Sequence, residues 1–206
     1  MNLQKMSFPE CEYFREEFPK RQIVLHHTVS ATAKSAGNWW MSDKGTQRIA
    51  AAFIVEKDGT VFKLFDPKFW AYHIGKGSTR MQNQNSIAIE IVNEGGLMKS
   101  IDKGKDSFHW FNGQKPYTGE VITLAKPWRG YTFFAAYTAQ QYEAVMELLN
   151  LLCECFSIPD ILIASYLFSG KYRNFKGIVS HHNLRADKSD VSRAFDYSRL
   201  RMAVQK

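Results

Sequence analysis

Four of the six histidines in this 206-residue chain form two adjacent pairs, His26-His27 and His181-His182. Each pair ends a short apolar run that predicts a buried strand. Neighbouring residues of a strand face opposite sides of a sheet, so one histidine of each pair can reach a shared site. Imidazole nitrogen is a common zinc ligand, usually together with thiolate or carboxylate. The pairs therefore suggest part of a metal site, although polar strand ends without any metal would give the same pattern.

A carboxylate near the second pair could complete a set of three ligands. Asp190 lies in the same segment as His181, two residues after Lys188. Three protein ligands leave a fourth zinc position open for water, as in zinc hydrolases. Histidine and aspartate at this loose spacing also occur by chance, so these residues alone leave zinc as one of several interpretations.

Three short runs are expected to position these residues. Residues 22–26 and 86–93 are rich in β-branched and small residues and predict buried strands. Residues 177–182 have the same pattern as the first run, a short apolar stretch followed by histidines, and predict another strand that ends in possible ligands. Glu90 lies in the middle of the second run, where a carboxylate requires a functional role or a charged partner.

The remaining elements predict an α/β domain. Residues 50–65 form two apolar runs around Lys57-Asp58-Gly59, the pattern of a β-hairpin. From Thr138 the apolar residues recur at helical spacing, with Thr138 as N-cap and Gln141 three residues later. Residues 96–131 are polar, aromatic and without clear periodicity, and predict a surface loop or hairpin over the site.

Composition limits the class of protein. Hydrophobic residues make up 45% and charged residues 23%, which predicts one folded domain. The net charge of +7 would suit nucleic acid, but equally a polyanionic cell wall, and the scattered lysines disfavour nucleic acid. No apolar run is long enough to span a membrane, and the N-terminus lacks the apolar core of a secretory signal.

Taken in order, the motifs resemble the zinc-dependent N-acetylmuramoyl-L-alanine amidases of the phage-lysozyme and peptidoglycan-recognition-protein superfamily. Five segments carry the resemblance: IVLHHTVSAT (23–32), FIVEKDGTVFKLF (53–65), WAYHIG (70–75), NQNSIAIEIVN (83–93) and IVSHHNLRADKSDVSRAFD (178–196). Their shared order is more specific than any single motif.

The resemblance implies a single domain with a central mixed β-sheet flanked by helices and a zinc site at the rim of the sheet. Residues 1–20 would be an N-terminal extension, and residues 21–206 the catalytic domain, with 96–131 as an insertion.

The resemblance also assigns the metal ligands. His26, His181 and Asp190 match the zinc ligands of the family, with His182 as the alternative to His181. Position 183 is asparagine where family members usually carry an acid, which weakens a supporting role beside the ligands.

Two further residues match the family's catalytic groups. Glu90 would be the general base or the residue that orients water, and Lys188 would stabilise the oxyanion. The alternatives are a structural, salt-bridged Glu90 and a solvated Lys188. Ala51 stands roughly where some phage members have a tyrosine, so only the glutamate version of the mechanism fits.

Substrate contacts follow from the same comparison. His73 and Asn85 match positions that line the substrate groove in the family. Trp70 could offer an aromatic surface to a sugar, although an aromatic residue at a strand end more often belongs to the core.

The implied function is hydrolysis of the amide bond between N-acetylmuramic acid and L-alanine in peptidoglycan, with Zn²⁺ as cofactor and a monomeric enzyme. One alternative is a non-catalytic peptidoglycan-recognition module, which commonly lacks the acid or thiolate ligand. Another is a regulator that binds an intracellular partner such as a polymerase. Without a visible export signal, the chain is expected to be made in the cytoplasm and to reach the cell wall as a phage or prophage endolysin.

Overall fold

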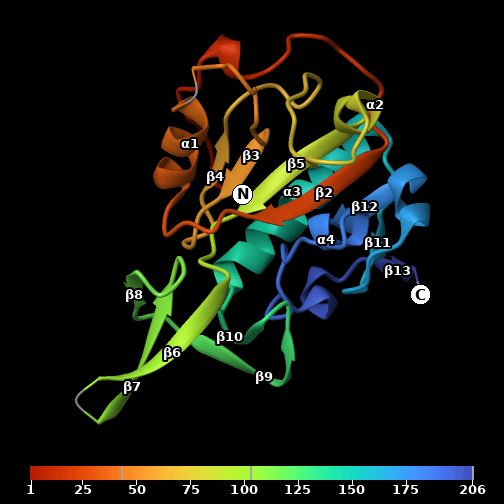
Figure 1. Cartoon of the computed structure of the whole chain (residues 1–206). Coiled ribbons are helices and arrows are strands. Elements are labelled where there is room, and N and C mark those ends of the chain that lie inside the picture. Colours follow the sequence, from red (N-terminus) through yellow and green to blue (C-terminus); the bar gives the residue numbers. More distant parts are fainter. Residues whose placement is uncertain (43, 103, 206) are drawn as a thin grey trace.

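In a computed structural model, residues 1–42, 44–102 and 104–205 are described. Eight strands form the main sheet in the order β1-β4-β3-β5-β2-β12-β11-β13 (Figure 1). Only the β3–β4 pair is antiparallel, so the sheet is mixed, as predicted. The strands are β1 (Leu3–Lys5), β2 (Gln22–His27), β3 (Phe53–Val55), β4 (Val61–Lys63), β5 (Ser86–Ile91), β11 (Ile161–Ile163), β12 (Gly177–Ser180) and β13 (Ala203–Gln205).

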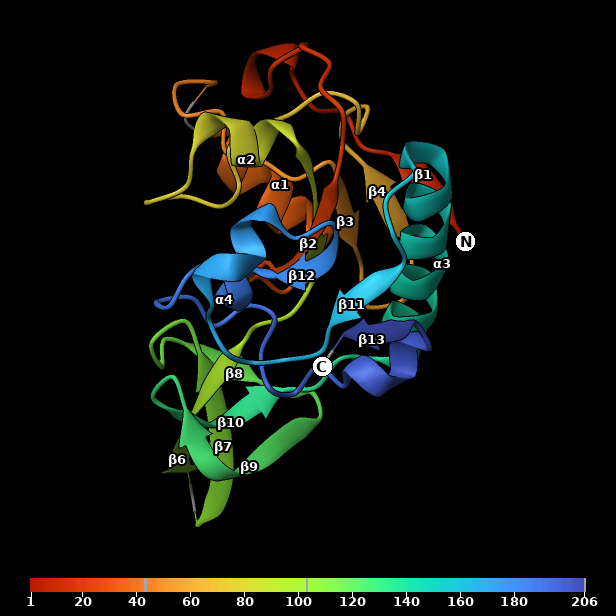
Figure 2. The same ribbon diagram turned by 90° about the vertical axis from the view of Figure 1, so that its right-hand side faces the viewer.

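Helices cover both faces of this sheet. Figure 2 shows α3 on one side and α1, α2 and α4 on the other. The helices are α1 (Ala33–Met41), α2 (Arg80–Gln84), α3 (Ala139–Phe156) and α4 (His181–Leu184), and short 3-10 turns lie at Glu10–Glu12, Gly170–Asn174 and Tyr197–Leu200. No described helix is both long and apolar enough to cross a bilayer.

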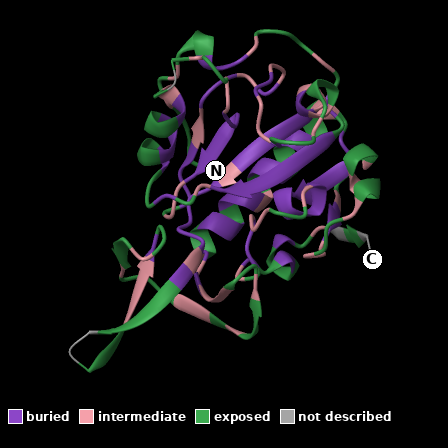
Figure 3. Cartoon of the chain, in the orientation of Figure 1, coloured by how far each residue is buried: buried purple, intermediate pink, exposed green. Residues whose placement is uncertain are grey.

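The predicted helix and hairpin are confirmed. α3 begins with a capping box in which Thr138 and Gln141 satisfy each other's backbone N–H groups. Its apolar stripe is buried against the sheet. The hairpin β3–β4 turns at Lys57-Asp58-Gly59, where Gly59 adopts φ +85°. In Figure 3 the central strands β2 and β5 are buried almost throughout, as their apolar sequences indicated.

The third predicted strand is shorter than expected. β12 ends at Ser180, and His181 and His182 form the first turn of α4, so the prediction of a strand through 182 is wrong there. The reason is a local cap: the side chain of Asn183 accepts from the backbone N–H of Ser180 in a capping box. The strand alternation that separates His26 from His27 therefore does not apply to the second pair.

Residues 96–131 and their continuation form a second, antiparallel sheet in the order β8-β7-β6-β10-β9. Its strands are β6 (Gly96–Asp102), β7 (Lys105–Trp110), β8 (Lys115–Tyr117), β9 (Val121–Trp128) and β10 (Tyr131–Ala135). The sheet has a small core of its own around Leu97, Trp110 and Ala135, and its far end is exposed (Figure 3).

The N-terminal segment adds to the main sheet. β1 pairs in parallel with β4 and forms one edge, and Phe14 makes a bridge to Trp70. Lys20 is buried, and its ammonium donates to the carbonyl oxygens of Phe69 and Gln84 at 2.8 and 2.7 Å. The first 20 residues thus pack on the domain that they precede.

Candidate active site

Three parallel neighbours, β5, β2 and β12, bring the chemically active residues together. His26 on β2 lies directly opposite Glu90 on β5. Ser180 at the end of β12 lies opposite Leu25, so His181 follows beside His26. Because paired positions on adjacent strands point to the same face, Glu90 and both histidines meet at the carboxyl end of the sheet.

Asp190 completes the cluster. Its Oδ2 atom lies 3.1 Å from His26 Nδ1 and 2.8 Å from His181 Nδ1, and the two Nδ1 atoms are 3.0 Å apart. All three side chains are largely buried. Donor atoms at these separations can all lie about 2 Å from one common point, the usual length of a zinc–nitrogen or zinc–oxygen bond.

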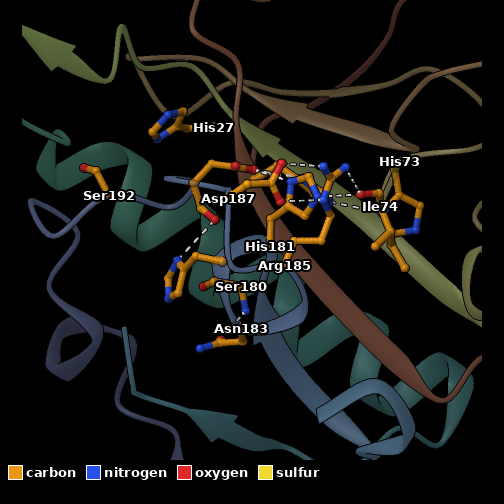
Figure 4. A network of polar contacts seen from close by, with 12 residues as sticks. His27, His73, Ile74, Ser180, His181, Asn183, Arg185, Asp187 and Ser192 are labelled. Carbon is orange, nitrogen blue, oxygen red and sulfur yellow. Dashed lines mark hydrogen bonds and ion pairs between the residues drawn. The ribbon is translucent and has the colours of Figure 1, made fainter. Parts of the chain in front are cut away.

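Hydrogen bonds fix which nitrogen of His181 faces the cluster. Its Nε2 lies 2.8 Å from the carbonyl oxygen of Ile74, which can only accept, so Nε2 carries the proton. The neutral ring then presents the lone pair of Nδ1 to Asp190 and His26. Figure 4 shows His181 next to Ile74, with Arg185 beside them.

A relay sets the same tautomer in His26. The Ser86 hydroxyl donates to the Gln82 carbonyl at 2.6 Å and so accepts from His73 Nε2 at 2.7 Å. His73 Nδ1 is therefore an acceptor for the Nε2–H of His26, at 3.1 Å. Burial lowers the pKa of His26 to about 4, which keeps its ring neutral and its Nδ1 free of a proton at pH 7.

The donor set therefore fits a metal ion. Two imidazole lone pairs and a carboxylate oxygen converge on one point, and neither Nδ1 atom carries a proton that could bridge the two nitrogens. A cation bound at this point would stabilise the arrangement. Both rings donate their other N–H to fixed acceptors, as metal-binding histidines usually do. Nitrogen and carboxylate donors together suit Zn²⁺.

Glu90 lies beside this donor set. Burial raises its pKa well above the ordinary value, with a further contribution from Asp190, whereas Lys188 opposes the rise. Its Oε2 atom is buried and has no hydrogen-bonding partner within the described ranges. A buried carboxylate with a free oxygen and a raised pKa can accept and then return a proton.

The segment that carries Asp190 is held by residues that the sequence did not single out. The backbone N–H of His182 donates to the Asp190 carbonyl at 2.9 Å. The Ser192 N–H donates to the hydroxyl of Tyr137 at 3.3 Å, and this hydroxyl lies in hydrogen-bonding distance of His27 Nδ1, at 2.9 Å. In Figure 4, His27 and Ser192 lie on the side away from His73. The second histidine of each pair therefore supports the Asp190 segment.

Arg185 and Gly75 lie next to the Ile74 carbonyl that accepts from His181. The Arg185 Nη1 donates to the Ile74 carbonyl at 3.1 Å, the same oxygen that accepts from His181. Gly75 has φ +81°, and a Cβ on it would lie 2.4 Å from Arg185 Nη1. The glycine in WAYHIG thus makes room for an arginine, which the motif alone does not reveal.

A cavity of about 1030 Å³ opens above the donor set. His26, His73, Glu90, His181, Lys188 and Asp190 all contribute to its wall. Its size is that of a site for a sizeable organic ligand. Lys188 is half-buried and lines the cavity, so its ammonium can reach a bound ligand.

Two of the expected substrate contacts do not line this cavity. Trp70 is 1% exposed, stacks on Phe14 and donates to Glu16, so its ring belongs to the core. Asn85 ends α2, where its backbone carbonyl accepts from the N–H groups of Arg21 and Gln22.

The asparagine that serves the site is Asn83, in the same motif. Its buried Oδ1 accepts from the backbone N–H groups of His73 and Ile74, at 3.0 and 3.1 Å. His73 does line the cavity, but both of its ring nitrogens are engaged within the protein. It acts in this structure as a support for His26.

The chain is similar to known proteins both in its sequence profile and in its fold. The sequence profile of the N-acetylmuramoyl-L-alanine amidase family matches residues 17–193. No curated protein sequence matches the chain significantly.

Solved structures share the fold at low sequence identity. A selenomethionine derivative of AmpD has a TM-score of 0.54 and 16% identity, covering 97% of this chain and 93% of its own. The amidase LysC from Clostridium intestinale URNW has a TM-score of 0.55 and 13% identity, covering 97% and 94%. The Ph2119 endolysin of a Thermus scotoductus MAT2119 bacteriophage has a TM-score of 0.51 and 16% identity, covering 93% and 89%.

Proposed function

The chain belongs to the N-acetylmuramoyl-L-alanine amidase family of peptidoglycan hydrolases, and we propose that it cleaves the amide bond between N-acetylmuramic acid and L-alanine with a bound zinc ion. The observation that carries this proposal is the convergence of three unprotonated donor atoms beside Glu90. His26, His181 and Asp190 would hold the ion. The complete ligand set favours an enzyme over a recognition module without catalysis.

Zinc, when bound, supplies a Lewis acid that polarises the amide carbonyl and makes water a better nucleophile at neutral pH. Glu90 takes a proton from the attacking water and passes it to the leaving nitrogen, a role that its free buried oxygen and raised pKa support. Lys188 places a positive charge against the oxyanion of the tetrahedral intermediate. Collapse of this intermediate breaks the C–N bond and releases the stem peptide with a free amino terminus.

The test measures new L-alanine amino termini released from purified peptidoglycan. We expect release by zinc-loaded protein, loss on chelation and recovery when zinc is restored. Glu90→Gln should lose at least about a hundredfold in kcat while it still binds zinc, since the general base contributes on this order. No release by zinc-loaded protein from walls of several stem-peptide types would overturn the proposal.

We also propose that the polymeric wall is the natural substrate and that the protein acts as an endolysin. The size of the cavity and its extension by the second sheet support a long ligand. The protein should then release more termini from intact sacculi than from soluble muropeptides at equal bond concentration. A clear preference for soluble muropeptides would indicate recycling instead.

A further inference from the structure

The second sheet forms part of the cavity wall, although it lies outside the sheet that carries the metal ligands. Trp110 at the end of β7, Phe111 in the following turn and Lys115 at the start of β8 all line the cavity. The wall also includes Trp39 from α1, and in Figures 1 and 2 α1 lies on one side of the end of β2 while β8 lies on the other. Two separate parts of the fold thus face each other across the metal site.

Phe111 adopts a conformation that is unfavourable for its residue type. It has φ +52°, followed by Asn112 at +55° and Gly113 at +81°. The left-handed region suits glycine and asparagine, whereas a bulky side chain is rare there. The ring is also 51% exposed, so burial does not compensate for the strain. A strained and exposed aromatic residue at a cavity wall indicates a role in binding.

Lys115 carries a positive charge next to this ring. Its Nζ lies 4.9 Å from the centre of the Trp110 ring and 5.5 Å from that of Phe111. It makes no ion pair with a carboxylate in the part of the chain that the structure describes. Aromatic faces hold the ammonium in place and leave it available to an anion.

The opposite wall has a different chemistry. Trp39 is 66% exposed, and Ser35, one helical turn earlier on α1, also lines the cavity. An open indole face with a hydroxyl group near it suits the apolar face of a sugar and its hydroxyl groups. The cavity wall therefore has an exposed indole on α1 and an aromatic pair with a cation on the second sheet, and Lys76 and Lys188 line other parts of it.

We propose, on the basis of the proposed function, that the second sheet binds the stem peptide and that Lys115 recognises one of its carboxylates. Phe111 and Trp110 hold the lysine and cover the peptide, while the glycan lies against Trp39. The scissile amide, which joins glycan to peptide, then lies over the metal ligands between the two ends. The second sheet would thus select substrates by the charge of the peptide.

The experiment compares two soluble muramoyl peptides that differ only in whether the stem-peptide carboxylates are free or amidated. Zinc-loaded native protein should show a kcat/KM roughly three- to tenfold higher for the free form, the range of a partly exposed charge-assisted contact. Lys115→Met should abolish this ratio through an increase in KM for the free form. Lys126→Met is the matched control, because Lys126 is exposed on β9 of the same sheet but does not line the cavity.

Two further variants test the aromatic residues of the cavity wall. Phe111→Asn removes the ring and keeps a residue that tolerates the left-handed backbone, so the variant should remain folded. It should raise KM severalfold for both substrates. Trp39→Ala should also weaken both substrates but leave the ratio between them as in the native protein.

The outcomes separate the inference from the function on which it rests. If Lys115→Met is folded and keeps the native ratio, or if Lys126→Met loses it equally, the assignment of Lys115 is overturned while the amidase remains. A native protein that cleaves both peptides equally would also overturn it. Cleavage of neither peptide and no release from purified walls by zinc-loaded native protein would contradict the proposed function itself. If walls alone are cleaved, the same ratio is measured on walls with free and with amidated stem-peptide carboxylates.

Discussion

His26 and His181 present Nδ1 to the cluster because their Nε2 atoms are held by other groups. For His181 the acceptor is a backbone carbonyl, and for His26 it is His73, whose own tautomer depends on Ser86. Such contacts usually change metal affinity by 10- to 100-fold in proteins. The histidine in WAYHIG therefore supports His26.

We predict that His73→Phe lowers zinc affinity by about 10- to 100-fold, because His26 loses the acceptor that fixes its tautomer. Competition with a chromophoric chelator measures this directly, without reference to activity. His109→Phe is the control, since His109 lies on β7 and does not line the cavity. His73→Asn, which can still accept a hydrogen bond, should recover part of the affinity. Equal affinity in all variants would exclude the relay.

His182 should affect the metal through Asp190. Its ring Nε2 lies 3.0 Å from the Ser165 carbonyl and its Nδ1 lies 3.2 Å from the Asp190 carbonyl. His182→Ala leaves the ligands in place but frees the Asp190 segment, and we expect about a tenfold loss of zinc affinity. The same chelator competition measures it. A complete loss of binding would instead make His182 a ligand in place of His181.

At the scale of elements, the register of three parallel strands builds the site. A shift of β5 by one residue would turn Glu90 to the opposite face, because side chains alternate along a strand. β12 must also end at Ser180 and α4 begin at His181, so that His181 points at His26. Loops and α2 then hold these ends in position.

Lys20 joins two of those supporting segments, since it binds the carbonyls of Phe69, before WAYHIG, and Gln84, at the end of α2. Burial lowers its pKa to about 7, below the value of about 10.4 in an unfolded chain. The unfolded state therefore holds more protons between these two values, and stability from this group rises with pH across that window.

We predict that native protein gains up to about 2 kcal/mol in unfolding free energy relative to Lys20→Met between pH 7 and pH 9. Chemical denaturation of both proteins at the two pH values gives this difference, and all other titrating groups cancel. Lys63→Met, at a half-buried position of β4, serves as control. A difference that does not change with pH would show that Lys20 stays protonated in the folded state.

At the scale of the whole molecule, the metal should link the two halves of the main sheet. His26 lies on β2, whereas His181 and Asp190 follow β12, so one ion would tie residues 164 positions apart. A ligand that binds only the folded state stabilises it by an amount set by its concentration relative to Kd.

Zinc at about 100 times its Kd should therefore add about 2.7 kcal/mol, and should raise Tm by roughly 5–10 °C for a chain of this size. Thermal unfolding with zinc and with chelator measures the shift. His26→Asn should unfold at the same temperature in both conditions, because one ligand is missing. A native protein that is indifferent to zinc would contradict the metal assignment.

The second sheet is anchored where it leaves the main one. The Asn93 side chain donates to the carbonyls of Ala135 and Ala136 and accepts from the Gly95 N–H. Lys57 of the hairpin pairs with Glu94 in the same place. These contacts keep the ends of β6 and β10 together, so the cavity wall contributed by β7 and β8 is carried on a fixed base.

The sequence by itself determined the local elements of this protein. Helical spacing and a capping pair specified α3, an Asp-Gly turn specified the hairpin, and apolar runs marked the strands, because these patterns act over a few neighbouring residues. The order of motifs was enough to name the family and to single out His26, His181, Asp190 and Glu90.

Only the tertiary structure decided how these residues meet. The register of β2 against β5, the tautomers set by Ile74 and His73, and the support of Asp190 by His182 depend on contacts between distant segments. The same is true of Trp70, which is buried instead of facing the substrate. Residues 96–131 carry no clear period because they form a partly exposed sheet with a small core, so their place at the cavity appears only in three dimensions.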